Sequence, residues 1–137
     1  MRLYIIVLLL SFFTTIQAQI SHTFTLYEFR YAKDKDFNEI GENNIFQIYT
    51  LPDNNNIAQL FADAQLETFD INSYIYNYQY LVDSCNNITI SFKIKKKHRY
   101  HGNLNVIITK DYDKDYYLIN IFRRFIDFDI YFKAHID

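Results

Sequence analysis

The amino-acid sequence predicts a mainly β domain of the α+β class, an antiparallel meander of five or six strands covered by one helix. Apolar residues alternate with polar ones along several segments, which is the pattern of strands with one buried face. Aromatic side chains favour strands and are abundant, with 13 Tyr and 13 Phe among 137 residues. A small closed β-barrel is the alternative. The presence of only two glycines disfavours it, since tight strand corners commonly use glycine.

The chain begins with the pattern of an export signal. Arg2 precedes an apolar run from Leu3 to Phe13, and the small residue Ala18 offers a cleavage point. This run is shorter than the roughly 20 apolar residues that span a membrane. We therefore expect a signal peptide over residues 1–18 and a single secreted domain, periplasmic or extracellular, over residues 19–137. No membrane span is expected after cleavage.

Charge and cysteine content limit the partners of the domain and the means of its stabilisation. The chain has 14 basic and 16 acidic residues, which argues against a nucleic-acid binder, because such a protein carries a basic excess. Its one cysteine, Cys85, cannot form an internal disulfide, so core packing has to stabilise the domain in an oxidising compartment. Because glycine is scarce, Asn and Asp are expected to form the turns.

Residues 74–110 carry the clearest strand pattern and predict a three-strand meander. Its alternating sets are Tyr74, Tyr76, Tyr78, Tyr80 and Val82, then Ile88, Ile90, Phe92 and Ile94, then Leu104, Val106 and Ile108. Turns over 83–87 and near Arg99 predict the cross-strand pairs Tyr80–Ile90, Tyr78–Phe92, Tyr76–Ile94, Phe92–Val106 and Ile90–Ile108. In this register the apolar side chains share one side of the sheet, as a common core requires.

The segments before the meander predict two strands and the covering helix. The first strand changes phase between Phe24 and Leu26 and the set Tyr27, Phe29 and Tyr31, which a β-bulge or burial on both faces explains. A short strand is expected over residues 45–51, after the polar loop 33–44. The helix is expected over residues 57–66, where capping groups at 53–56 precede a helix-face spacing of Ile57, Leu60, Phe61 and Ala64.

The end of the chain predicts one more strand, over residues 126–134. Residues 116–125 fit either a strand or a helical stripe made of Leu118, Ile121, Phe122 and Phe125. A single strand over 116–134 would extend for about 60 Å. We therefore expect a bend or break near Arg123 and Arg124.

Two surface features are candidate binding sites. One is a row of hydroxyl-tipped rings that suits an apolar or sugar-like ligand, or else forms a core face with its hydroxyls at the rim: Tyr74, Tyr76, Tyr78 and Tyr80. The other is a hairpin tip whose mutually repelling cations invite an anion or an acidic protein surface: Lys93, Lys95, Lys97 and Arg99. The alternative for the tip is a solvated one whose lysines protect a sheet edge.

No pattern predicts a metal ion, a cofactor or a catalytic centre. His98 and His101 would lie on opposite faces of a strand. The series Asp111, Asp113 and Asp115 begins like a calcium loop, but the glycine and the final glutamate of such a loop are missing.

Other reactive groups give weak signals. Cys85 has no cationic neighbour that would activate its thiol. Chance alone explains an acid pair for glycoside hydrolysis drawn from Glu28, Glu67, Asp127 and Asp129. Asn87-Ile88-Thr89 is a glycosylation sequon that matters only in a eukaryote.

The sequence therefore favours a secreted, non-enzymatic binding domain. Its ligand would lie on the aromatic sheet face, or an acidic partner would bind the basic hairpin tip. The first alternative is a protein-interaction or surface-assembly module that pairs through a sheet edge and has no small-molecule pocket. The second is a small secreted hydrolase.

Overall fold

The computed structural model describes residues 19–64, 67–95, 104–123 and 128–137, which form antiparallel strands and no helix. No helix long and apolar enough to cross a membrane occurs in these four ranges. The strands in chain order are β1 (Ser21–Tyr31), β2 (Asn38–Glu39), β3 (Ile45–Thr50), β4 (Asn56–Ala64), β5 (Glu67–Val82), β6 (Ile88–Ile94), β7 (Leu104–Lys110), β8 (Tyr117–Phe122) and β9 (Asp129–Ile136).

Eight of these strands close into a barrel. Each strand from β3 to β9 pairs with the next, β3 also pairs with β1, and β9 pairs back with β1 over residues 24–31. The two-residue strand β2 adds to β1 outside this cycle. The open meander with a covering helix is therefore wrong, and the alternative of a small closed β-barrel is confirmed.

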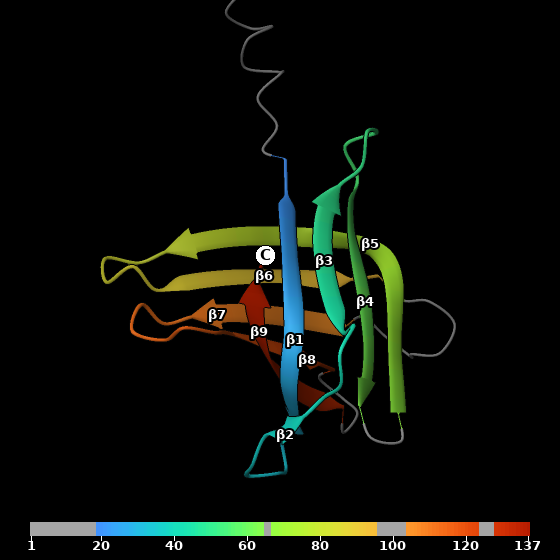
Figure 1. Ribbon diagram of the computed structural model, residues 1–137. Coiled ribbons are helices and arrows are strands. Elements are labelled where there is room, and N and C mark those ends of the chain that lie inside the picture. Colours follow the sequence, from blue (N-terminus) through green and yellow to red (C-terminus); the bar gives the residue numbers. More distant parts are fainter. Residues whose placement is uncertain (1–18, 65–66, 96–103, 124–127) are drawn as a thin grey trace, which may run out of the picture.

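The barrel consists of two sheets that cross steeply, and two long strands belong to both (Figure 1). The first half of β5, residues 67–74, pairs with β4, and its second half, residues 75–82, pairs with β6. The first half of β1 pairs likewise with β3 and its second half with β9. Strands that switch sheets in this way form the corners of an orthogonal barrel.

A β-bulge lies at each of these corners. The register shifts between Leu26 and Glu28 in β1, as the change of phase in the sequence predicted, and between Tyr76 and Gln79 in β5. A bulge bends its strand and increases the local twist. It also exchanges the two faces of the strand, because one extra residue moves every later side chain to the opposite side.

Glycine does not form the two corners. The scarcity of glycine was therefore a wrong reason to disfavour a barrel. The described non-glycine residues with positive φ are all asparagines, which tolerate the left-handed region better than other side chains: Asn43, Asn54, Asn77 and Asn86. Asn77 has a φ of 56° and lies in the β5 bulge itself. The expectation that asparagine replaces glycine in the turns is confirmed at Asn54 and Asn86.

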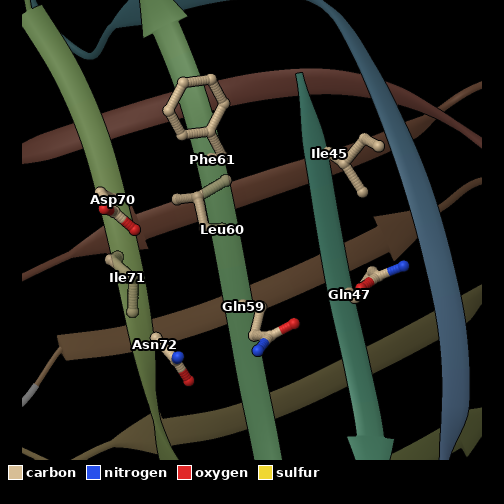
Figure 2. Close-up of a pocket in the computed structure, with 8 residues that line it drawn as sticks. All are labelled: Ile45, Gln47, Gln59, Leu60, Phe61, Asp70, Ile71 and Asn72. Atoms are coloured by element: carbon tan, nitrogen blue, oxygen red, sulfur yellow. The ribbon is translucent and has the colours of Figure 1, made fainter. Parts of the chain in front are cut away.

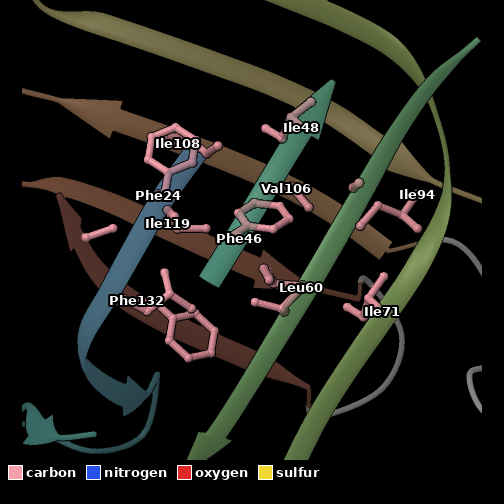
Figure 3. Close-up of a cluster of buried hydrophobic side chains, with 14 of the residues drawn as sticks. Phe24, Phe46, Ile48, Leu60, Ile71, Ile94, Val106, Ile108, Ile119 and Phe132 are labelled. Atoms are coloured by element: carbon pink, nitrogen blue, oxygen red, sulfur yellow. The ribbon is translucent and has the colours of Figure 1, made fainter. Parts of the chain in front are cut away.

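The lumen of the barrel is packed with apolar side chains from every strand of the cycle (Figure 3). Phe46 on β3 and Phe92 on β6 bridge the two sheets, with ring centroids 6.3 Å apart. Phe24 on β1 lies 6.3 Å from Phe46 in turn. These rings are almost fully buried, so they close the middle of the lumen.

The segment predicted as the covering helix is strand β4. Ala58, Leu60 and Ala62 point into the lumen and are buried, whereas Ile57 and Phe61 lie on the outer face. Both faces of this strand carry apolar residues, and the inward-facing alanines are too small to make the strand alternation visible in the sequence. The larger apolar residues therefore matched the spacing of a helix face by coincidence. The expected capping residue Asp53 instead accepts hydrogen bonds from Asn55 in the turn between β3 and β4.

The predicted three-strand meander is confirmed in β5, β6 and β7. The pairs Phe92–Val106, Ile90–Ile108 and Tyr80–Ile90 are as expected. Tyr76 pairs with Lys93 rather than with Ile94, because the bulge intervenes. The ambiguous residues 116–125 contain strand β8, and a break follows it, since β8 ends at Phe122 and β9 begins at Asp129.

Substitutions at Asn77 test the bulge. Asn77→Val should lower the free energy of unfolding by about 1–2 kcal/mol, because a β-branched residue is strained at positive φ. Asn77→Gly should leave it within about 1 kcal/mol of the parent protein. Urea unfolding measures both. Asn72→Val, at an exposed extended position of the same strand, is the control, and an equal loss at residues 72 and 77 would contradict a left-handed residue in the bulge.

Candidate functional site

The β5 bulge divides the row of four tyrosines that the sequence placed on one face. Ile71, Ser73 and Ile75 point into the lumen before the bulge, so Tyr74 and Tyr76 lie on the outer face. After the bulge the phase is reversed. Tyr78 packs against the core, and Tyr80, paired with the buried Ile90, has the same inward orientation. The single aromatic face is therefore replaced by two tyrosines outside the barrel and two facing its lumen.

Lumen-facing side chains are partly exposed at one end of the barrel, which we call the barrel mouth. Three apolar side chains there face the lumen by their register yet are about half exposed: Tyr80 at 47%, Val82 at 52% and Ile136 at 44%. Half-buried side chains complete this face, namely His22, Tyr78, Ile88 and Tyr117. The apolar residues deeper in the lumen are buried.

The β5–β6 and β7–β8 hairpins form one side of the mouth and extend beyond β1 (Figure 1). Their loops are joined, because the backbone N–H of Tyr112 donates to the side-chain oxygen of Asn87 at 2.9 Å. Asp83 holds the first loop by accepting hydrogen bonds from the backbone N–H groups of Cys85 and Asn87. These hydrogen bonds to the charged form lower the pKa of the Asp83 carboxyl.

A histidine and two tyrosines form the polar part of the mouth. The Tyr78 hydroxyl lies 3.3 Å from Nε2 of His22, within hydrogen-bond distance. The rings of His22 and Tyr80 are nearly parallel, with an angle of 2° between them and centroids 6.2 Å apart. Burial lowers the pKa of His22 and raises the pKa of Tyr78, and both shifts favour the uncharged form of the side chain. The mouth thus combines apolar rings with uncharged hydrogen-bonding groups.

Tyr117, on β8, also faces the mouth. Its ring makes an edge contact with Phe24, with centroids 5.3 Å apart, so it rests on the rings that close the lumen. Burial raises the pKa of Tyr117, with a smaller contribution from Tyr80. Lys110 approaches the same ring with its ammonium 6.0 Å from the centroid.

A second concavity lies on the outer surface of the barrel, over β3, β4 and β5 (Figure 2). It has a volume of about 290 Å³. Its outward-facing side chains are amides, a carboxylate and apolar groups: Ile45, Gln47, Gln59, Phe61, Asp70 and Asn72. Leu60 and Ile71 also line it, although their side chains point into the lumen. No prediction from the sequence pointed to this surface, because Gln59 and Phe61 were assigned to the helix.

The basic hairpin tip is described only at its base. Lys93 and Lys95 are both exposed, and Lys93 pairs across the sheet with Tyr76. Lys97 and Arg99 lie outside the described residues, together with His98 and His101. The prediction of an acidic partner at this tip therefore remains a prediction.

The other candidates do not form a reactive centre in the part of the chain that the structure describes. No group of three or more His, Cys, Asp or Glu side chains is placed there to hold a metal ion. Glu28 forms an ion pair with Lys133 at 3.1 Å, and Asp129 accepts a hydrogen bond from Asn120, so these two carboxylates have separate partners. Asp127 and the side chain of Glu67 lie outside the described part.

Two side chains in the 83–87 loop were singled out from the sequence. Cys85 is exposed and unpaired, as expected for a lone cysteine. The amide of Asn87, in the glycosylation sequon, donates to Asp83 and accepts from Tyr112. Both ends of this amide are therefore engaged in holding the loops.

Comparison with known proteins assigns no family. The chain matches no protein-family model, and no curated protein and no solved structure shows significant similarity to it.

The buried position of His22 predicts a pH-dependent contribution to stability. Its pKa in the folded protein lies below the ordinary value of 6.5, so below pH 6.5 the unfolded chain takes up a proton that the folded protein resists. The free energy of unfolding should therefore fall as the pH decreases from about 6.5 towards the folded pKa.

His22→Phe isolates this effect, because it keeps a ring beside Tyr80 and removes the titrating group. Urea unfolding over roughly pH 7.5 to 5, the range in which histidine titrates, measures it. The parent protein should lose stability relative to the variant as the pH falls. A difference between the two that stays constant over this range would contradict a lowered pKa at His22.

Proposed function

We propose that residues 19–137 act outside the cytoplasm as a non-enzymatic binding domain that takes an apolar ligand at the barrel mouth. The observation that carries this proposal is the exposure of lumen-facing apolar side chains at the mouth. Tyr80, Val82 and Ile136 face the same lumen as buried residues, yet the described residues leave each of them about half exposed. The export pattern at the start of the chain supports action outside the cytoplasm.

The mouth suits an apolar ligand for two physical reasons. Covering clustered apolar side chains removes their surface from water. A ligand that does so gains about 25 cal/mol of binding free energy per Å² of apolar surface buried. The hydroxyl of Tyr78 and the neutral imidazole of His22 offer a few directional contacts that would orient such a ligand. Because Phe24, Phe46 and Phe92 close the lumen below, the ligand would lie across the mouth rather than pass deep into the barrel.

A neutral fluorescent dye tests the mouth. N-phenyl-1-naphthylamine, which brightens in apolar surroundings, should bind saturably. Val82→Asp should weaken this binding tenfold or more, because it places a charge on the face that the dye would bury. The readout is a fluorescence titration.

Leu81→Asp is the matched control. Leu81 is the adjacent residue of the same strand, is similarly exposed and points to the outer face. It should leave the affinity within about twofold of the parent value. Absence of saturable binding, or an equal loss in the two variants, would refute a ligand site at the mouth.

One specific observation supports the second candidate function, assembly through a sheet edge. The second half of β5, residues 75–82, pairs with β6 on one side and has no partner strand on the other among the described residues. Such an edge can pair with another chain. The bulge at Asn77 works against this, because it twists the strand at the beginning of the free edge.

Sedimentation velocity separates the two candidates. A ligand-binding domain should remain monomeric over a roughly hundredfold range of concentration, which is wide enough to reveal micromolar association. It should also melt at a higher temperature with the dye. An edge-pairing module should instead sediment faster as its concentration rises, without any ligand. Concentration-dependent association without a shift in melting temperature would favour the second candidate.

A further inference from the structure

The outer concavity over β3, β4 and β5 contains three amide side chains in one cross-strand row. Gln47 pairs with Gln59, and Gln59 pairs with Asn72. Neighbouring strands lie about 4.8 Å apart, so the three amides extend over roughly 10 Å. Figure 2 shows them side by side on the three strands.

These amides are available to a ligand. None of the three has a hydrogen-bond partner among the described residues, although each carries two donors and an acceptor. The amide of Asn44, close by in the chain, behaves differently. It is buried, donates to the carbonyls of Gly41 and Glu42, and accepts from the N–H of Asp63. The three amides of the row therefore differ from Asn44 in keeping their hydrogen-bonding groups unused among the described residues.

Apolar side chains flank the amide row on both sides. Ile45 and Phe61 form a pair on one side, and the Phe61 ring is 49% exposed. Tyr49, Ile57 and Tyr74 form the next outward-facing row on the other side. A ligand over the amides would meet hydrogen-bonding groups below it and an aromatic surface at its edge.

A carboxylate adds a charge preference. Asp70 lines the concavity, pairs across the sheet with Phe61, and has no cationic partner among the described residues. It would accept hydrogen bonds from hydroxyl groups and repel an anion. The volume of about 290 Å³ is just below the range of about 300–1,000 Å³ for ligand pockets.

From this arrangement we infer that the outer concavity is a binding site for a neutral sugar. Ring hydroxyls would bond to the amides of Gln47, Gln59 and Asn72 and to Asp70, and the apolar face of the sugar ring would pack against Phe61. This site is separate from the mouth, because it lies on the opposite face of the barrel wall. It does not depend on the function proposed there.

Side-chain amide resonances of the ¹⁵N-labelled protein test the inference directly. The probes are cellohexaose and hexa-N-acetylchitohexaose as neutral sugars and hexagalacturonate as an anionic one, at about 10 mM to reveal weak binding. At least one neutral hexaose should shift the NH₂ signals of Gln47, Gln59 and Asn72, and hexagalacturonate should not. The NH₂ signal of Gln79, an exposed outward-facing residue of β5 beyond the bulge, should not move.

Matched variants distinguish this site from a general surface effect. Gln59→Ala and Phe61→Ala should abolish the shifts, whereas Gln79→Ala and Ile107→Ala, at exposed positions elsewhere on the barrel, should preserve them. Val82→Asp should also preserve them, which separates the sugar site from the mouth. No shift with either neutral sugar, equal shifts with hexagalacturonate, or shifts that survive in Gln59→Ala and Phe61→Ala would overturn the inference.

Discussion

The structure depends on two strands that each serve both sheets of the barrel. β1 and β5 change partner halfway along their length, and without that change the two sheets would remain open and unconnected at their corners. A straight strand cannot do this, because its neighbours in the two sheets run steeply to one another. The bulges near Tyr27 and Asn77 provide the bend, and with it the exchange of faces in the second half of each strand.

This exchange of faces decides which side chains meet a ligand. In the first half of β5 the outward residues include Asp70, Asn72 and Tyr74, which place polar and aromatic groups on the outer wall. In the second half the inward residues are Tyr78, Tyr80 and Val82, which extend past the opposite sheet and remain partly in water. One strand therefore contributes to both candidate sites, and the bulge between them determines which tyrosine belongs to which face.

Much of the sheet was predictable because its pattern is unambiguous. The pairing of β6 with β7 followed from clean alternation of Ile90 and Phe92 with Val106 and Ile108. Strand β4 was mistaken for a helix because Ala58 and Ala62 face the lumen while the larger Ile57 and Phe61 face out, so residue size hid the period of two. Long-range closure between β1 and β9 has no local signal at all.

The division of the tyrosine row was within reach of the sequence. Ile71 and Ile75 alternate in one phase and Tyr78 and Tyr80 in the other, with Asn77 between them, which is the same change of phase that indicated the bulge in β1. The row of tyrosines at every second position concealed it, because aromatic rings suit either face of a strand. The outer concavity was not predictable, since it needs three strands to bring its amides together.

Both candidate sites depend on the bulge at Asn77, and nuclear Overhauser contacts of the tyrosine rings test this bulge most directly. If the faces exchange at this residue, the Tyr78 ring protons should show contacts to His22 and Phe92, and the Tyr76 ring protons should show none to any lumen residue. Contacts between the rings of Tyr76 and Phe92 would mean that β5 continues without a bulge. That result would contradict both the corner and the assignment of Tyr80 to the barrel mouth.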